Sequence, residues 1–428
     1  MRRYESYKDS GVEWLGEVPS HWGLTIGMNV FRENKRDNKG MKEKTVLSLS
    51  YGQIIIKPEE KLVGLVPESF ETYQIVEPND IIIRCTDLQN DQTSLRTGLA
   101  KDKGIITSAY LNLKVINNHS AKFLHYYLHA LDITKVLYKF GSGLRQNLSF
   151  LDFKRLPIID IPLSEQQKIA QFLDDKTAKI DQAVDLAEKQ IALLKEHKQI
   201  LIQNAVTRGL NPDVPLKDSG VEWIGQVPEY WEVKKLKYLA KLSPSKSEIT
   251  CNHEESCSFI PMEKLKLNTL ILDEIKQIKN VYSAYTYFRD EDLLIAKVTP
   301  CFENKNFAIA KNLVNSIGFG SSEIYVLRTY NNLLNKFLFY RLQEQNFMEI
   351  AISKMSGTGG LKRVPSEFIN NFQLALPPFC EQQKIADYLD TQTAKIDQAI
   401  ALKTAHIEKL KEYKSVLIND VVTGKVRV

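Results

Sequence analysis

The sequence predicts an α+β protein built from two related modules, each followed by a long helix. The first observation is a tandem repeat: Ser10-Gly-Val-Glu-Trp14 returns as Ser219-Gly-Val-Glu-Trp223, and Glu165-Gln-Gln-Lys-Ile-Ala170 returns as Glu381-Gln-Gln-Lys-Ile-Ala386. The second is that residues 165–207 contain neither Pro nor Gly, which favours one long helix. The third is that short strand-like runs fill the residues between the motifs, where the two halves share little sequence. Repeated motifs that enclose two segments of different sequence suit a protein that holds two different recognition surfaces.

Within the modules, apolar or alternating runs bounded by Asn, Asp, Gly or Pro predict strands at residues 80–84, 111–115, 293–297 and 324–327. Helical segments are predicted at residues 123–129 and 337–342. The Gly-containing stretch 317–321 is predicted to be a turn. It does not follow a strand and open a helix, as a nucleotide-binding glycine loop does.

Apolar residues step by three and four along both long helices, as in a coiled coil. The predicted seams comprise Ile180, Val184, Ala187, Ile191, Leu194, Lys198, Leu201 and Ala205 in the first helix, and Ile396, Ile400, Lys403, Ile407, Leu410, Lys414, Leu417 and Val421 in the second. Lys198 and Lys414 interrupt the seams at matching places; snorkelling stems are the favoured interpretation, and a register-setting role is the alternative. Antiparallel pairing is favoured, because parallel pairing would stretch the linker of about 20 residues almost fully. Ser164 is the predicted N-cap of the first helix.

The repeat divides the chain into five parts. We expect a first module at residues 1–160, a first long helix at 161–208, a linker with the repeated opening motif at 209–227, a second module at 228–378, and a second long helix with the C-terminal tail at 379–428. A pseudo-twofold axis is predicted to relate the two modules and their helices.

Composition excludes several classes of protein. With 428 residues and 43% hydrophobic content, the chain can bury several cores, and its net charge of +5 is only mildly basic. No apolar run approaches the roughly 20 residues that span a bilayer, and no signal-peptide core follows the N-terminus, so we expect a cytoplasmic location and no membrane partner. The five cysteines lack paired spacing and predict reduced thiols; a zinc site at Cys251, His253 and Cys257 is the weaker alternative.

No catalytic constellation is present in the sequence. The motifs GxxxxGK[ST], HExxH and GxSxG are all missing. Leu376-Pro377-Pro378-Phe379 differs from the Asn/Asp-Pro-Pro-aromatic motif of amino-methyltransferases at the residue that must accept a hydrogen bond from the target amine. We expect a chain with no catalytic residues and no cofactor or metal of its own.

A loop that combines glycines with cations and amides occurs near the end of each module. Such loops bring backbone amides close to phosphates, and Arg, Gln and Asn side chains make paired hydrogen bonds to base edges. An ordinary solvated turn is the alternative, but the recurrence before both long helices favours DNA contact. The candidates are Ser142, Arg145, Gln146, Asn147, Ser356, Thr358, Lys362 and Arg363.

Other polar loops lie next to predicted strands and supply weaker candidates for DNA contact. Each of these loops is equally well explained as a hairpin turn or a strand-end loop. The candidates are Ser50, Tyr51, Gln53, Arg84, Thr86, Arg96, Lys297, Thr299, Asn304 and Lys305.

Over nearly its full length, the chain resembles the specificity subunits of type I restriction-modification systems. The resemblance is carried by the two doubled motifs, the module endings at residues 147–157 and 366–372, the two long helices, and the stretch 318–328. It implies that residues of about 20–160 and 228–377 are target-recognition domains, each reading one half of a split double-stranded DNA target. Because the two modules differ, the target is expected to be asymmetric. The helices would set the unread gap.

The resemblance also implies partners for the chain. Two modification subunits would dock on the helices and module flanks and methylate adenine at N6 with S-adenosylmethionine, and up to two restriction subunits would cleave DNA with ATP and Mg²⁺. These cofactors would belong to the partners. Two alternatives remain open: a coiled-coil scaffold whose modules bind proteins and never DNA, and a DNA-binding regulator that acts alone.

Overall fold

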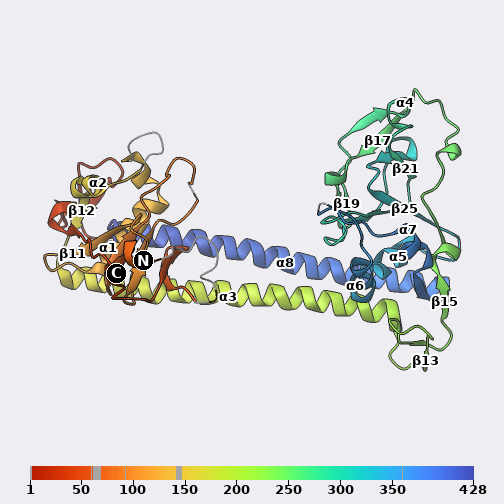
Figure 1. The fold of residues 1–428 in the computed structure, drawn as a ribbon, viewed down its shortest axis with the longest axis horizontal. Coiled ribbons are helices and arrows are strands. Elements are labelled where there is room, and N and C mark those ends of the chain that lie inside the picture. The colour runs from red at the N-terminus through yellow and green to blue at the C-terminus, as the bar shows by residue number, and fades with distance from the viewer. Residues whose placement is uncertain (1, 59, 61–68, 92, 141–146, 359) are drawn as a thin grey trace. The chain divides into compact units, whose positions relative to one another are not determined.

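The computed structural model describes residues 2–58, 60, 69–91, 93–140, 147–358 and 360–428 (Figure 1). It contains two compact units: unit 1 consists of Met1–Glu188 with Thr404–Val428, and unit 2 of Lys189–Lys403. Each unit holds one module together with a segment of both long helices. The α+β class with two repeated modules is confirmed.

The two long helices are α3 (Leu163–Arg208) and α8 (Phe379–Val422). Each continues without a break from one unit into the other. The predicted N-cap at Ser164 is wrong, because α3 already begins at Leu163 and the backbone amides of Glu165 and Gln166 donate to the Pro162 carbonyl. Among the described residues, no helix has the length and apolar content to cross a membrane.

The helix segments pair in opposite directions within each unit, as predicted. In unit 1, Lys414 Nζ near the end of α8 lies 2.7 Å from an Asp181 carboxylate oxygen early in α3. In unit 2, Lys198 Nζ near the end of α3 lies 2.6 Å from an Asp397 oxygen early in α8. The lysine stems are largely covered while both aspartates are more than half exposed, so the ammonium groups reach acids at the edge of the seam.

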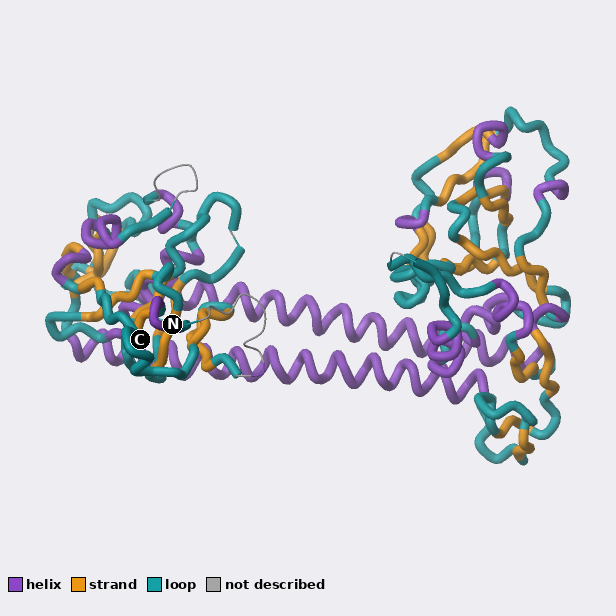
Figure 2. The backbone as a smooth tube through the Cα atoms, viewed as in Figure 1, coloured by secondary structure: helices purple, strands orange, loops and turns teal. Residues whose placement is uncertain are grey.

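The described residues of the unit 1 module form mostly antiparallel strands together with helices (Figure 2). Its strand pairs are β1 (Tyr7–Asp9) with β2 (Glu17–Pro19), β3 (Gly23–Ile26) with β12 (Pro157–Asp160), β5 (Leu47–Ser50) with β6 (Gln53–Ile56), and β7 (Gln74–Val76) with β10 (Gly104–Ile106). A four-stranded sheet has the order β4 (Phe31–Glu33), β11 (Leu111–Val115), β8 (Ile81–Ile83), β9 (Thr97–Leu99). The helices are α1 (Ala121–Ile133) and α2 (Phe150–Arg155), and short 3-10 turns cover Gly27–Asn29, Phe70–Thr72 and Val136–Lys139.

The unit 2 module repeats this plan. Its strand pairs are β13 (Leu216–Asp218) with β14 (Gln226–Pro228), β15 (Glu232–Lys235) with β26 (Gln373–Leu376), and β18 (Leu265–Lys266) with β19 (Thr269–Leu270). Its four-stranded sheets have the orders β16 (Ala240–Leu242), β25 (Ile324–Thr329), β22 (Leu293–Ala296), β23 (Phe307–Ile309), and β20 (Ile275–Gln277), β17 (Ser256–Ile260), β24 (Ile317–Gly320), β21 (Thr286–Arg289). The helices are α4 (Ile278–Val281), α5 (Asn335–Arg341), α6 (Gln345–Ser353) and α7 (Ser366–Asn371), with 3-10 turns at Leu236–Tyr238, Lys246–Glu248, Met262–Lys264 and Val314–Ser316.

The predicted turn at residues 317–321 is wrong, because Ile317–Gly320 form strand β24. This strand pairs in parallel with β17 and antiparallel with β21. Unit 1 shows the same order with fewer hydrogen bonds: Val46, the residue before β5, forms a parallel bridge with Ile105 of β10, and β10 pairs with β7. The two modules therefore share one topology despite their different sequences.

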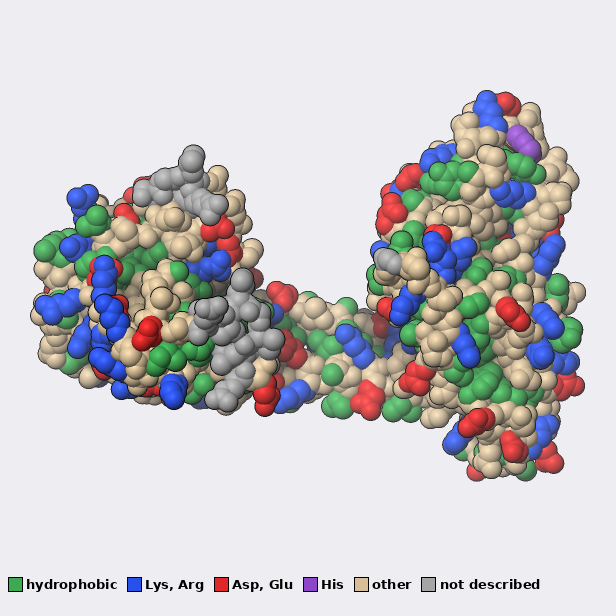
Figure 3. All heavy atoms as spheres, in the orientation of Figure 1, with side chains coloured by type: hydrophobic (Ala, Val, Ile, Leu, Met, Phe, Trp, Pro, Cys, Tyr) green, Lys and Arg blue, Asp and Glu red, His purple; other side chains and the backbone are tan. Residues whose placement is uncertain are grey.

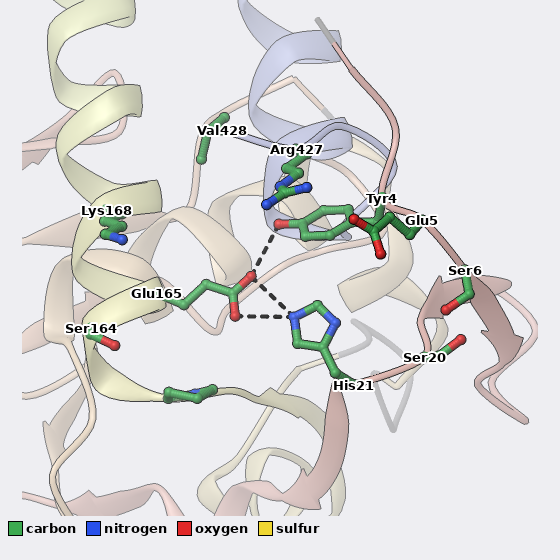
Figure 4. A pocket seen from close by; sticks show the side chains of 11 residues that line it. Tyr4, Glu5, Ser6, Ser20, His21, Ser164, Glu165, Lys168, Arg427 and Val428 are labelled. Atoms are coloured by element: carbon green, nitrogen blue, oxygen red, sulfur yellow. Dashed lines mark hydrogen bonds and ion pairs between the residues drawn. The ribbon is translucent and has the colours of Figure 1, made fainter.

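A buried Trp that follows each repeated opening motif contacts the repeated motif at the start of a long helix. In unit 1, the Trp22 indole donates to Glu165 Oε1 at 3.2 Å. The Tyr4 hydroxyl donates to the same oxygen at 3.1 Å, and His21 Nε2 lies 3.2 Å from the other carboxylate oxygen (Figure 4). Trp22 is fully buried. Because a buried indole N–H needs an acceptor, Glu165 fixes the segment around Trp22 to the first turn of α3.

Unit 2 builds the same junction from the second copy of the motifs. The buried Trp231 indole donates to Glu381 Oε2 at 3.2 Å, and the Tyr230 hydroxyl donates to the same oxygen at 3.0 Å. Tyr230 thus occupies the place that His21 has in unit 1. The tandem repeat is explained by this shared joint between module and helix, which forms part of a frame common to both units.

Candidate nucleic-acid interface

In unit 1, two of the predicted loops meet beside the end of strand β8. Ile81–Ile83 are buried, and the chain then leaves the sheet at Arg84. The Leu148 amide donates to the Cys85 carbonyl at 2.9 Å, and the Asp87 amide donates to Asn147 Oδ1 at 2.9 Å. The strand-end loop that carries Arg84 and Thr86 and the segment that follows the glycine loop therefore form one surface.

Unit 2 brings the equivalent loops together beside strand β22. The Val364 amide donates to the Lys297 carbonyl at 2.9 Å, and the Thr299 amide donates to the Lys362 carbonyl at 3.0 Å. The Thr299 hydroxyl donates to the Gly360 carbonyl at 2.9 Å and accepts from the Lys362 amide at 3.1 Å. Two loops that the sequence presents separately, at 297–300 and 356–363, thus form one surface in this unit also.

The exposed candidates on these surfaces are polar or aromatic. They are Tyr51, Gln53 and Asn147 in unit 1, and Asn304, Ser356, Thr358, Lys362 and Arg363 in unit 2. Ser50, Arg84, Thr86, Lys297 and Thr299 are partly buried. Ser142, Arg145 and Gln146 lie outside the described residues.

The hairpin β5–β6 adds a third segment to the surface of unit 1. Ser50 pairs with Gln53, so Tyr51 and Gly52 form a two-residue turn. A Cβ atom on Gly52 would lie 3.1 Å from Leu95 Cδ1, which places the turn against the loop between β8 and β9. Tyr51 is 93% exposed at the tip.

Arg96 is a predicted DNA-contact candidate whose side chain is fully buried. Its guanidinium donates to the carbonyls of Thr86 at 2.8 Å and Asp87 at 3.2 Å, and to Tyr138 Oη at 3.0 Å. A buried guanidinium is costly unless its donors find acceptors, and this loop supplies them. Arg96 therefore shapes the strand-end loop from beneath and does not reach its surface.

Lys305, another candidate for DNA contact, is partly buried and bonded within unit 2. Its ammonium donates to Gln199 Oε1 of α3 at 2.8 Å and to the Gln343 carbonyl at 2.7 Å. Burial, reinforced by the nearby Lys198 charge, lowers the pKa of Lys305. The residue ties the turn after β22 to the helix within unit 2, whereas its neighbour Asn304 stays exposed.

Carboxylates that the sequence did not single out hold two of the candidate arginines. Arg84 Nη1 lies 3.0 Å from Asp91 Oδ2, and hydrogen bonds from Ser94 lower the pKa of Asp91 to about 2. Arg363 makes a paired contact with Glu323, with Nε–Oε2 at 2.8 Å and Nη2–Oε1 at 3.0 Å. Asp91 follows Arg84 in the same loop, so the sequence could have indicated this pair. Glu323 lies 40 residues before Arg363, and only the pairing of strands brings the two together.

The arrangement suits contact with a polyanion. Guanidinium groups pre-oriented by a carboxylate can exchange that partner for a phosphate or the edge of guanine, and amides and hydroxyls beside them can contact other bases. Across the described residues, no group of three or more His, Cys, Asp or Glu side chains could hold a metal ion. Cationic and acidic side chains are interspersed over both units in the view of Figure 3, as the small net charge leads one to expect.

Comparison with known proteins identifies the family. The model for the type I restriction modification DNA specificity domain matches residues 30–195 and 228–412, so it recurs in both halves and covers most of the chain. The chain belongs to this family.

Relatives with curated names agree with this assignment. Similar proteins are the type I restriction enzyme EcoAI specificity subunit of Escherichia coli, 38% identical over 163 residues, and the EcoEI specificity subunit of the same species, 35% identical over 163 residues. Each match covers 37% of this chain and 27% of the relative, so the chain spans about a quarter of those proteins. The putative MjaX specificity subunit of Methanocaldococcus jannaschii is 23% identical but matches 97% of this chain and 96% of its own length.

Solved structures show the same fold. A chain from a structure of a type I restriction-modification system has a TM-score of 0.66 at 16% identity and covers 96% of this chain and 99% of its own length. The HsdS subunit from Thermoanaerobacter tengcongensis has a TM-score of 0.53 at 17% identity, covering 96% and 98%.

Proposed function

We propose that this chain is the DNA sequence-specificity subunit of a type I restriction-modification complex, in which each unit reads one half of a split, asymmetric target. One observation supports this most directly: the two units share a frame, and at the same place in that frame each unit carries a pair of loops with different side chains. Unit 1 offers Arg84, Thr86 and Asn147 there, and unit 2 offers Lys297, Thr299 and Arg363. Different polar side chains on matched scaffolds select different bases.

The long helices are proposed to set the unread gap between the half-sites. The support is that α3 and α8 both pass unbroken from one unit to the other, and that each unit fixes both helices through its own core. Leu417 and Val421 of α8 belong to the core of unit 1, and Ile202 and Val206 of α3 belong to the core of unit 2. A change in helix length would therefore move one unit without changing its loops.

The outer faces of the helices are proposed to bind two modification subunits. Leu186, Leu193 and Ile200 of α3 recur every seventh residue and are exposed by half or more, and Leu402 and Val416 occupy matching positions on α8. Exposed apolar residues at helical spacing are typical of a surface that another helix covers. Position 409 of α8, which matches Leu193, is Lys409.

Leu193→Lys therefore places on α3 a residue that α8 already accepts at the matching position. We expect the variant to fold and to lose copurification with the modification subunit, whereas Glu188→Gln, also exposed on α3, should retain it. Full copurification of Leu193→Lys would contradict this docking surface.

Within such a complex, this chain would carry no catalytic residue. Methylation of adenine at N6 with S-adenosylmethionine would belong to the modification subunits, and cleavage with ATP and Mg²⁺ would belong to restriction subunits where these are present. The function of this chain would be to position those partners on DNA, in the cytoplasm.

The salt dependence of DNA binding tests the proposal against the scaffold alternative. Phosphate contacts release counterions, so a complex that makes six to ten of them should lose roughly 10³–10⁵ in affinity between about 50 and 200 mM salt. We expect this steep loss for the complex with its modification subunits on genomic DNA. Binding that is absent at low salt, in a complex that is soluble and assembled, would favour a protein scaffold.

A further inference from the structure

Tyr51 has an unusual position for a large aromatic residue. It occupies the first place of the two-residue turn between β5 and β6, with φ of 47° followed by 76° at Gly52. Positive φ at both central residues is the type I′ geometry that joins hairpin strands of right-handed twist. At 93% exposure, the ring makes almost no contact with the rest of the chain.

The residue is a poor choice for the fold alone. In the type I′ turn, Asn-Gly and Asp-Gly are preferred, because Asn and Asp tolerate the left-handed region better than residues with bulky side chains. Gly52 meets this requirement at the second position, whereas Tyr51 does not meet it at the first. A local rule broken without a packing gain is typical of a residue that serves a function.

The hairpin holds Tyr51 firmly. The register runs without a bulge from Leu47 with Ile56 to Ser50 with Gln53, and the turn rests on Leu95 and His129. Leu95 immediately precedes Arg96, the buried residue that shapes the loop of Arg84 and Thr86. An exposed ring on a turn of fixed backbone register therefore stands next to the candidate DNA surface of unit 1.

We propose that Tyr51 stacks its ring on a nucleobase within the half-site that unit 1 reads. This inference rests on the proposed function. A phenol ring at a narrow hairpin tip enters a groove more easily than a broad surface does, and aromatic stacking on a base requires no particular base edge. Insertion of a ring beside a base costs least free energy at a pyrimidine-purine base-pair step, so Tyr51 favours half-sites that contain such a step.

Unit 2 has no such tip at the equivalent place. There the connection from β17 to β20 spans residues 261–274 and contains the small hairpin β18–β19. The stacking residue is therefore specific to one half-site, which gives the experiment an internal reference.

The test uses Tyr51→Asn and Tyr51→Phe in the complex with its modification subunits. Tyr51→Asn removes the ring while restoring the preferred Asn-Gly turn, so hairpin stability is kept or raised; Tyr51→Phe keeps the ring. Ile56→Ala, an exposed residue of the same hairpin, is the matched control. Binding is measured on duplexes that carry the methylated motif, with 2-aminopurine at successive positions of each half-site.

We expect Tyr51→Asn to weaken binding between about fivefold and one hundredfold and to abolish a 2-aminopurine signal confined to one half-site. Tyr51→Phe and Ile56→Ala should resemble the wild type. Wild-type affinity and an unchanged signal for Tyr51→Asn would overturn the inference while leaving the proposed function intact. Loss of complex assembly with Tyr51→Asn would also overturn it, since Tyr51 would then contact a protein partner. If the wild-type complex itself fails to bind DNA, the proposed function fails.

Discussion

Units 1 and 2 have the same joints between module and helix but present different side chains on their matching loops. Both attach a buried Trp to a Glu at the start of a long helix, Trp22 with Glu165 and Trp231 with Glu381, at the same distance of 3.2 Å. Both also end a buried strand in a polar loop that is bonded to the segment before a short helix, α2 or α7. The side chains presented on those loops differ. The comparison shows that the repeated residues build the joints and the divergent residues build the recognition surfaces.

Breaking either joint between module and helix should cause the largest loss of stability among the predicted variants. Trp22→Ala and Trp231→Ala each remove a buried indole and one of the donors to a carboxylate, at a cost of about 3–5 kcal/mol. Because each Trp belongs to a different core, hydrogen exchange should show lost protection in unit 1 for the first variant and in unit 2 for the second. Equal loss in both units after either substitution would contradict their independence.

Acid should destabilise unit 1 before unit 2. Burial lowers the pKa of His125 to about 4 and of His129 to about 3, so both are neutral in the folded protein. Their contribution to stability is present above the unfolded pKa of about 6.5 and is lost as pH falls towards the folded values. The loss between pH 7 and pH 5 is on the order of 2–4 kcal/mol for the pair. The histidines of unit 2, His197 and His253, are exposed.

Hydrogen exchange at pH 7 and pH 5, corrected for intrinsic rates, measures this difference. We expect peptides from unit 1 to lose protection at pH 5 and peptides from unit 2 to keep it. A double variant His125→Gln and His129→Gln should show a smaller change with pH in unit 1, even if its stability at pH 7 is lower. Matching losses in the two units would contradict the assignment to these buried rings.

The recognition surfaces should respond separately in DNA binding. Arg84→Ala and Arg363→Ala each remove a guanidinium from a different unit, and each should cost about 1–3 kcal/mol in binding if it contacts a base. Mapping the methylated motif should show relaxed preference in one half-site for Arg84→Ala and in the other for Arg363→Ala. Lys8→Ala, an exposed cation on β1, is the control and should leave both half-sites unchanged. If both variants relaxed the base preference at the same half-site, the proposal that each unit reads a different half-site would be refuted.

The seam lysines should give the smallest and most symmetric effect. Lys198 and Lys414 pair with aspartates that are more than half exposed, and such pairs contribute about 0.2–1 kcal/mol. Lys198→Ala and Lys414→Ala should therefore lower the melting temperature slightly and by similar amounts. A large drop in melting temperature for one variant alone would show that the two Lys–Asp pairs are not equivalent.

The sequence predicted the frame well because the frame leaves a periodic signal. The seams along α3 and α8 follow from helix geometry, and the doubled motifs follow from packing that is repeated within the chain; both are visible as regular spacing in the sequence. Strands β8, β11, β22 and β25 were recognisable because buried strands are short apolar runs between turn residues. Strand β24 was missed, because two glycines in a run of four residues suggest a turn, whereas here they admit the ring of Phe288.

The candidate site was predicted in pieces. The polar loops were found, but nothing in the sequence states that the loop after β22 meets the loop before α7, because long-range hydrogen bonds such as those of Thr299 bring them together. The burial of Arg96 and Lys305 could not be predicted for a related reason: a cation that bonds to backbone carbonyls beneath a loop has the same local sequence as one that faces solvent. Tertiary burial decides between the two, and it leaves no local pattern.

The central claim is that two different units read two different halves of one DNA target. The most direct test is to express the chain with its modification subunit in a methylation-free host and to map N6-methyladenine across the genome by single-molecule sequencing. The account predicts a split, asymmetric motif that disappears when this chain is omitted. A palindromic or uninterrupted motif, or no new methylation from a soluble complex with an active partner, would contradict it.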